Sequence, residues 1–136
     1  MEPWMGALMD NLEVLTQGQE GGNWARAATN DLLRSRIKIR SLNFMRGRTF
    51  LNRLLILDEA QNLTPKQMKA LITRAGPGTK LACLGNIAQI DTPYLTETTS
   101  GLTYVVNRFR GWPHSGHVTL VRGERSRLAD FASDTL

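Results

Sequence analysis

The pattern of hydrophobic and polar residues is clearest in the middle of the chain, where an unbroken aliphatic run ends in two acids. Residues 54–57 are Leu-Leu-Ile-Leu, and Asp58 and Glu59 follow directly. A short apolar run bounded by polar residues is typical of a strand buried on both faces, as in a parallel sheet. Ligands of such sheets bind at the carboxyl ends of the strands. The pattern therefore predicts a buried strand over residues 53–57 with two carboxylates at its ligand-binding end.

The strongest local signals predict a helix after this strand. Thr64 is a suitable N-cap, Pro65 suits the first helical position, and Gln67 completes a capping box. The apolar residues that follow share one helical face at i, i+3, i+4 and i+7: Met68, Leu71, Ile72 and Ala75. Gly76 and Pro77 are expected to end the helix, and the apolar run at residues 80–84 predicts a second buried strand.

The remaining elements follow from the same periodicities. Apolar residues at helical spacing predict further helices over residues 3–16, 24–34, 102–109 and 125–132. Alternating or continuous apolar runs predict strands over residues 37–42 and 117–121, and residues 87–99 are expected to form a loop. From residue 36 the order is strand, strand, helix, strand, helix, strand, helix. This order predicts an α/β fold in three layers, with a mostly parallel sheet and flanking helices.

Composition narrows the class of protein without naming a ligand. The chain has 136 residues, of which 41% are hydrophobic, and 17 Lys and Arg outnumber 12 Asp and Glu, giving a formal net charge of +5. This surplus fits a phosphate-rich partner, but nucleic acid, nucleotide and simple solubility all remain open. Cys83 is the single cysteine, no apolar run approaches the ~20 residues that span a bilayer, and the start does not resemble a signal peptide. We expect a cytoplasmic protein with no membrane partner.

The two acids have a chemical interpretation and a structural one. Phosphoryl transfer needs a positioned Mg²⁺ and an oriented nucleophile. Asp58 would hold the Mg²⁺, through its water shell because Mg²⁺ gives up water reluctantly, and Glu59 would orient the attacking water. The structural alternative is a solvated turn after a strand. Four aliphatic residues before Asp-Glu-Ala-Gln favour the chemical interpretation.

A phosphate-binding loop of the form G-x-x-x-x-G-K-[ST] should accompany these acids, but the chain contains none. The nearest candidate, residues 76–80 (Gly-Pro-Gly-Thr-Lys), has the wrong spacing. It also follows a helix and precedes a strand, the reverse of the order that such a loop requires. We interpret it as a helix end and turn, so the sequence holds the metal and water half of a nucleotide site without the phosphate half.

Several short motifs follow one another along the chain, at residues 45–49, 57–62, 73–74, 89–91, 100–102 and the arginine-rich 122–127. Together, and in that order, they resemble the PhoH family. PhoH-like proteins are P-loop ATPases related to superfamily-one RNA helicases. Residues 3–7 and 89–94 are most similar to members that carry a PIN-type ribonuclease domain before the ATPase. The resemblance implies a RecA-like P-loop NTPase core that lacks its Walker A strand, loop and helix.

The resemblance also implies roles for single residues. Gln89 falls where related helicases sense the γ-phosphate. Asn86 stands where many relatives have Asp. The resemblance implies that both residues bind the cofactor, and the neutral Asn86 would add no charge there. Arg125 falls where the family has an arginine that could stabilise charge on the transferred phosphoryl group. Arg46 and Arg48 suit phosphate or nucleic acid. For all five, a polar or basic turn on the surface is the structural alternative.

These implications define the expected organisation and activity. Residues 1–136 would be the C-terminal part of a PhoH-like ATPase domain, with a helical segment at 1–35 and the core at 36–136. The complete protein is expected to use ATP and Mg²⁺, to act on RNA by unwinding or remodelling, and to form a homo-oligomer. The chain alone is expected to be inactive or nearly so. The alternative is a non-catalytic module, derived from a degenerate ATPase, that binds RNA or mediates oligomerisation.

Overall fold

The computed structural model describes residues 27, 31, 35–38 and 47–136. The chain divides into two compact units, Met1–Arg48 and Thr49–Leu136. In the first unit Ala27, Asp31 and residues 35–36 are helical, in agreement with the helix predicted over residues 24–34. Residues 37–38 have no regular structure, so the predicted strand does not begin at residue 37. The predicted helix over residues 3–16 and the rest of that strand lie outside the described residues.

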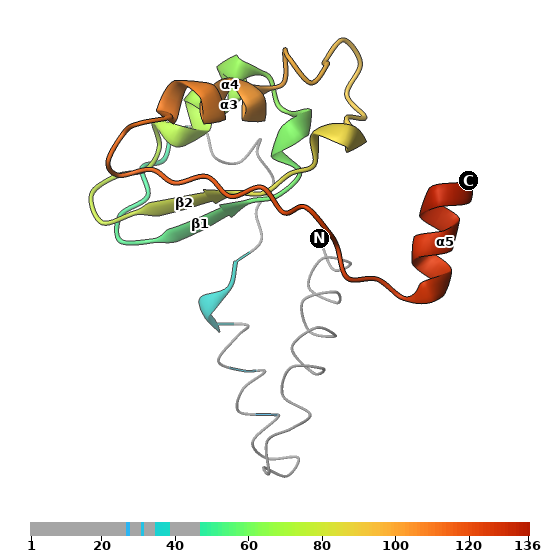
Figure 1. The fold of residues 1–136 in the computed structure, drawn as a ribbon. Coiled ribbons are helices and arrows are strands. Elements are labelled where there is room, and N and C mark those ends of the chain that lie inside the picture. The colour runs from blue at the N-terminus through green and yellow to red at the C-terminus, as the bar shows by residue number, and fades with distance from the viewer. Residues whose placement is uncertain (1–26, 28–30, 32–34, 39–46) are drawn as a thin grey trace. The chain divides into compact units, whose positions relative to one another are not determined.

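A parallel two-stranded sheet lies at the base of the second unit (Figure 1). Strand β1 spans Leu54–Leu57 and strand β2 spans Lys80–Cys83, with Leu54 paired to Lys80 and Leu57 to Cys83. Parallel neighbours require a crossover connection, usually through a helix. Here α3 (Pro65–Ile72) supplies it, so the predicted strand, helix and strand are confirmed as one β-α-β unit.

Helix α3 begins with the capping box that the sequence predicts. The Thr64 hydroxyl accepts the N–H of Gln67 at 3.2 Å, and the Gln67 side chain accepts the N–H of Thr64 at 2.9 Å. Two of the N–H groups left open at the start of a helix are thereby satisfied. The helix ends at Ile72, and the chain turns through residues 76–79, where Gly78 adopts a φ of 73°. The turn is confirmed, but the helix ends before Gly76 and Pro77, and Ala75, predicted on its apolar face, instead forms an isolated parallel bridge with Phe50.

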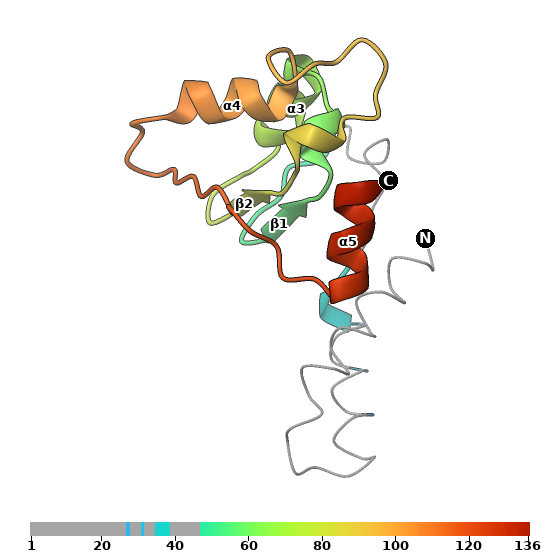
Figure 2. The same cartoon turned by 45° about the vertical axis from the view of Figure 1, so that its right-hand side comes forward.

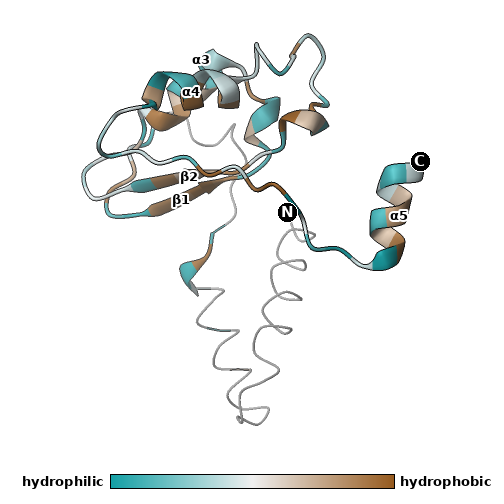
Figure 3. Cartoon of the chain, viewed as in Figure 1, coloured by the Kyte–Doolittle hydropathy of each residue, from teal (hydrophilic) through white to brown (hydrophobic). Residues whose placement is uncertain are grey.

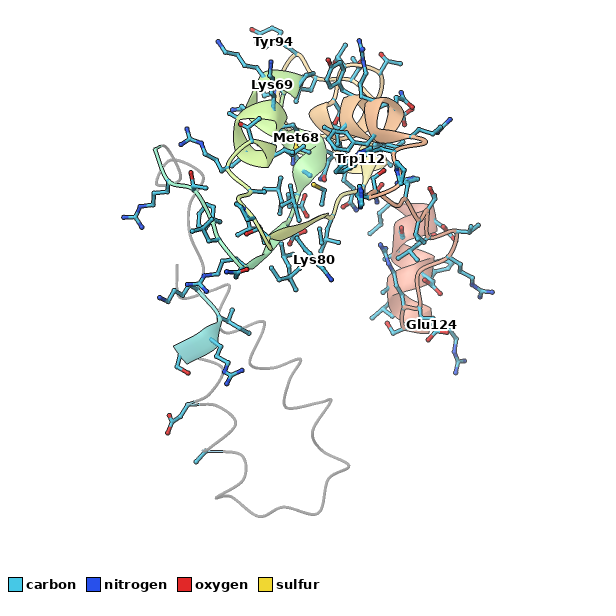
Figure 4. All side chains as sticks on the ribbon, turned by 90° about the vertical axis from the view of Figure 1, so that its left-hand side faces the viewer. Met68, Lys69, Lys80, Tyr94, Trp112 and Glu124 are labelled. Carbon is cyan, nitrogen blue, oxygen red and sulfur yellow. The ribbon has the colours of Figure 1, made fainter. Side chains whose placement is uncertain are left out.

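Helices α3 and α4 form a layer on one face of the sheet (Figure 2). Helix α4 spans Gly101–Phe109, and α5 spans Arg127–Thr135 at the end of a long coil outside this layer. The core is small and consists of Leu57, Ala60, Leu63, Met68 and Leu71. Met68 is fully buried inside the helical layer, whereas Tyr94 and Lys69 lie at its periphery (Figure 4). Among the described residues, no helix is long and apolar enough to cross a membrane.

The prediction that the first strand is buried on both faces is wrong. Leu55 and Leu57 point toward the helical layer, but Leu54 and Ile56 are 66% and 64% exposed. Both strands are coloured as largely hydrophobic in Figure 3, yet a strand is buried on two faces only when other elements cover both. In the described part of the Thr49–Leu136 unit, helices cover one face. The fold is therefore α/β, and residues 49–136 show two layers of it, the sheet and the helices on one face.

The strand predicted over residues 117–121 is also wrong. These residues form a coil, and Val118, Leu120 and Val121 are 80–97% exposed. No backbone hydrogen bond joins them to a neighbour within the part of the chain that the structure describes. An alternating apolar pattern becomes a strand only where a second strand satisfies its backbone groups.

Candidate functional site

The two acids stand at the carboxyl end of β1, as predicted. Asp58 follows the strand, and Glu59 caps the short 3-10 helix η2 (Ala60–Asn62) with φ 54° and ψ 35°. This left-handed conformation is uncommon for a residue with a side chain, because the Cβ crowds the backbone. The Asp58 carboxylate stabilises it by accepting the Glu59 N–H at 2.9 Å. Both carboxylates are exposed, so the turn presents two acids to solvent in a defined arrangement.

The end of β2 lies directly beside these acids. The N–H of Leu84 donates to the carbonyl of Leu57 at 2.8 Å, and the N–H of Ala60 donates to the carbonyl of Leu84 at 2.9 Å. These two bonds extend the parallel pairing past the strands and bring the turn after β1 next to Gly85 and Asn86. The Asn86 side chain then caps the 3-10 helix η3 (Ile87–Gln89) by accepting the Ala88 N–H at 3.0 Å.

A buried side-chain amide joins the two strand ends. Gln61 is fully buried, and its Nε2 donates to the Glu59 carboxylate at 2.5 Å and to the Gln89 carbonyl at 3.2 Å. Its Oε1 accepts the Asn86 N–H at 3.2 Å. Glu59, Asn86 and Gln89, which were predicted separately, therefore contact one side chain. Sequence reasoning gave Gln61 no role. Its place in the sequence, two residues after Glu59, does not reveal its burial, because the space that it fills opposite Gly85 appears only in the fold.

Two further side chains, Ser100 and Asn62, hold the turn after β1 in place. The hydroxyl of Ser100, which is also fully buried, donates to the Gln61 carbonyl at 2.8 Å. The Asn62 side chain accepts the N–H groups of Asp91 at 2.8 Å and Thr92 at 3.3 Å. The loop after η3 and the start of α4 are thus bonded to the residues that follow the two acids. Buried polar groups that all find partners in this way stabilise one arrangement of a site.

The arginines predicted for the site are not brought to it by any described contact. Arg48 is exposed beside Gly47, and Arg46 lies outside the described residues. Arg125 is exposed in the coil before α5, and no described contact links it to Asp58 or Glu59. The predicted roles of all three arginines stay predictions.

The donor set suits a hard cation that is shared with another ligand. Asp58 uses one carboxylate oxygen to hold a backbone N–H, and Glu59 uses one to hold Gln61. The second oxygen of each carries no hydrogen bond from the described residues. Within those residues, no group of three or more His, Cys, Asp or Glu side chains could form a metal cage. Proteins commonly hold Mg²⁺ through one or two carboxylates together with water and substrate phosphates, so Asp58 and Glu59 are the residues that could hold such an ion.

Comparison with known proteins identifies the family. The model of the PhoH family, described as PhoH-like protein, matches residues 1–130. The chain belongs to the PhoH-like family. It is 43% identical over 136 residues to Protein PhoH2 of Bacillus subtilis (strain 168), an alignment that covers all of this chain and 30% of that protein. Protein PhoH2 of Mycolicibacterium smegmatis (strain ATCC 700084 / mc(2)155) is 30% identical over 137 residues, covering all of this chain and 29% of that protein.

A second group of relatives matches a shorter part of this PhoH-like chain. The PhoH-like protein of Bacillus subtilis (strain 168) is 53% identical over 57 residues, which is 42% of this chain and 18% of that protein. The chain therefore spans less than a third of the length of the relatives it matches. The resemblance stated from the motifs is confirmed at the level of the family, while the activity of the whole protein is a separate question.

Proposed function

We propose that this PhoH-like chain supplies the Mg²⁺-binding and water-orienting half of an ATP-hydrolysing site. The observation that carries the proposal is the meeting of two strand ends at one edge of a parallel sheet. Asp58 and Glu59 stand at the first strand end, and Asn86 and Gln89 follow the second. Carboxyl ends of parallel strands are where ligands of α/β sheets bind. A P-loop NTPase core for the longer protein is part of the same proposal.

Each side chain has a role that its contacts allow. Asp58 keeps one oxygen free to hold Mg²⁺ through water, and a bound Mg²⁺ would supply neutralisation of charge on the phosphates. The free oxygen of Glu59 accepts a proton or a hydrogen bond from the attacking water. Asn86 and Gln89 are neutral, so they recognise phosphate or water by hydrogen bonding and add no charge. Arg125 remains the proposed source of positive charge for the transferred phosphoryl group.

The chain alone is expected to hydrolyse ATP weakly or not at all. No Gly-Lys pair occurs anywhere in its sequence, so the loop and lysine that grip the phosphates have no equivalent here. We propose that in the longer protein this half-site meets such a loop, and that hydrolysis is coupled to unwinding or remodelling of RNA. Turnover by the pure chain that disappears in Glu59→Gln would refute the expectation for the chain.

Metal binding provides a direct test of the half-site. Paramagnetic Mn²⁺, used in place of Mg²⁺ together with ATP, should broaden the NMR signals of residues 58–61 and 85–89 in the full chain. Asp58→Asn should abolish this broadening. Glu97→Gln, which removes an acid from the exposed loop before α4, is the matched control and should leave it unchanged. Equal broadening in Asp58→Asn and the unsubstituted chain would overturn the assignment.

A second candidate function rests on the exposed surface. Leu54 and Ile56 leave one face of the sheet apolar. Among the described residues no further strand pairs with the edges of the sheet, and open edges favour pairing with another chain. Three arginines at 122, 125 and 127 are exposed, and no ion pair joins them to a carboxylate among the described residues. These features favour a homo-oligomeric or RNA-binding module without catalysis.

Two measurements separate this module from the half-site. Light scattering over a range of concentrations should show self-association if the apolar face is an interface, and a monomer at high concentration would exclude it. Binding to a labelled single-stranded RNA should weaken steeply as salt rises if phosphate contacts dominate. No binding at low salt would remove RNA as a direct partner of this chain.

A further inference from the structure

The contacts of the buried Gln61 amide fix its orientation. Its nitrogen faces two acceptors, the Glu59 carboxylate at 2.5 Å and the Gln89 carbonyl at 3.2 Å, and its oxygen faces one donor, the Asn86 N–H at 3.2 Å. An amide nitrogen carries two protons and no acceptor site, so the flipped amide would lose all three bonds. The carboxylate of Glu59 is therefore linked through one rigid group to the turn that carries Gln89.

The opposite strand end leaves room for this amide. A Cβ added to Gly85 would lie 2.6 Å from Oε1 of Gln61 and 2.7 Å from Cδ2 of Leu102. Any side chain at position 85 would displace Gln61 or the start of α4. The Ser100 hydroxyl also holds the backbone of Gln61 by its carbonyl. Gln61 is thus held from the side of β2 and from the side of α4, and its amide contacts Glu59 in addition.

We infer that Gln61 is a positioning residue that couples Glu59 to the Asn86–Gln89 turn, so that the two strand ends respond as one unit. It touches no reacting atom. It holds one carboxylate oxygen of Glu59 and leaves the other facing solvent, and it transmits any displacement of that carboxylate to the backbone of Asn86 and Gln89. The inference rests on the proposed function and extends it: Gln61 would connect the acid that orients water to the turn that senses phosphate.

Backbone NMR signals of the full chain test the coupling without any nucleotide. Glu59→Gln replaces the carboxylate next to Gln61 by a neutral amide. It should shift the NMR signals of Gln61 Nε2 and of the backbone amides of Asn86 and Gln89. Asp58→Asn removes the same charge one residue away, keeps an Oδ1 that can accept the Glu59 N–H, and does not contact Gln61, so it should leave the Asn86 and Gln89 signals nearly unchanged. If both substitutions shift them equally, the effect is general electrostatics and the inference is overturned.

Substitution of Gln61 completes the experiment. In Gln61→Met, which has similar length and no amide, Glu59→Gln should no longer shift the Asn86 and Gln89 signals. Gln61→Leu, which also lacks an amide, is the second variant in case the first does not fold, and the shift should again be lost. A shift that persists in either folded variant refutes the coupling. Because no ATP is added, failure of ATP binding would count against the proposed function alone.

Discussion

Gly101, the first residue of α4, provides a sharp test of how the helical layer packs. A Cβ at this position would lie 2.6 Å from three atoms: the carbonyl oxygens of Leu63 and Thr64 and Cγ of Met68. Two of these are backbone atoms at the junction of η2 and α3 and cannot rotate away. The N–H of Gly101 also donates to the Leu63 carbonyl at 2.7 Å. Gly101→Ala must therefore push α4 away from the core or break this hydrogen bond.

Two opposing effects decide the sign of this substitution. Alanine is a better helix former than glycine by up to about 1 kcal/mol, so propensity alone predicts a more stable protein. Overpacking of a core typically costs about 1–3 kcal/mol, and loss of the hydrogen bond to Leu63 would cost roughly 1 kcal/mol more. We expect the steric cost to exceed the gain in propensity. The predicted result is a loss of about 1–3 kcal/mol in the free energy of unfolding.

Urea unfolding followed by circular dichroism measures this difference directly. Gly116→Ala is the matched control, because a Cβ at Gly116 meets no atom within 4 Å and its φ is ordinary. The control should be neutral or slightly stabilised, since alanine reduces the entropy of the unfolded chain. If Gly101→Ala were as stable as Gly116→Ala, the close packing of α4 against the η2–α3 junction would be wrong.

Three further substitutions or reactions test other parts of the unit. Met68→Ala should lower the free energy of unfolding by about 2–5 kcal/mol, because Met68 is fully buried between the helices; a loss below that range in calorimetry would contradict this burial. Thr64→Ala should cost about 1 kcal/mol through loss of the capping box, whereas Thr64→Ser should retain most of the stability in the same urea titration. Burial raises the pKa of the Cys83 thiol, which lowers its thiolate fraction at a given pH, so iodoacetamide at pH 8 should alkylate Cys83 more slowly in the folded chain than in urea. Equal rates would show that the thiol is not shielded.

The parts of the fold that were predicted correctly depend on signals close together in the sequence. The Thr64 and Gln67 capping box predicted the start of α3, and the apolar face of residues 102–109 predicted α4. The β-α-β unit followed because a short apolar run, an amphipathic helix and a second run stand in sequence. Each of these signals acts over a few residues, so one sequence is enough to interpret them.

The wrong predictions concern which other helix or strand packs against, or pairs with, a given element. Leu54 and Ile56 look identical to Leu55 and Leu57 in the sequence, but only the second pair faces the helical layer. Residues 117–121 have a strand-like pattern and find no partner strand among the described residues. Burial and strand pairing are non-local, and hydrophobic pattern alone does not supply the partner.

In the candidate site, too, residues marked by a local pattern were predicted and a residue that depends on distant contacts was missed. Asp58 and Glu59 were predicted from the aliphatic run before them, and the strand ends place them as expected. Gln61 was missed because nothing local distinguishes a buried amide from an exposed one. Its burial follows from the absence of a side chain at Gly85 and from the hydroxyl of Ser100, which stand 24 and 39 residues further along the chain.

Glu59 combines a strained backbone with two hydrogen bonds that hold it in place. A left-handed backbone at a residue other than glycine costs roughly 1–3 kcal/mol, and the Glu59 side chain is exposed, so its burial returns nothing. Glycine would adopt the same φ without this cost, but it would carry no carboxylate for Gln61 to hold. At Glu59 two hydrogen bonds accompany the strained backbone. Asp58 accepts its backbone N–H, and Gln61 donates to one oxygen of its carboxylate. Asn52 and Tyr94 also have a positive φ, so strain alone does not mark a functional residue; the two hydrogen bonds that hold Glu59 are what supports the proposal that it orients water.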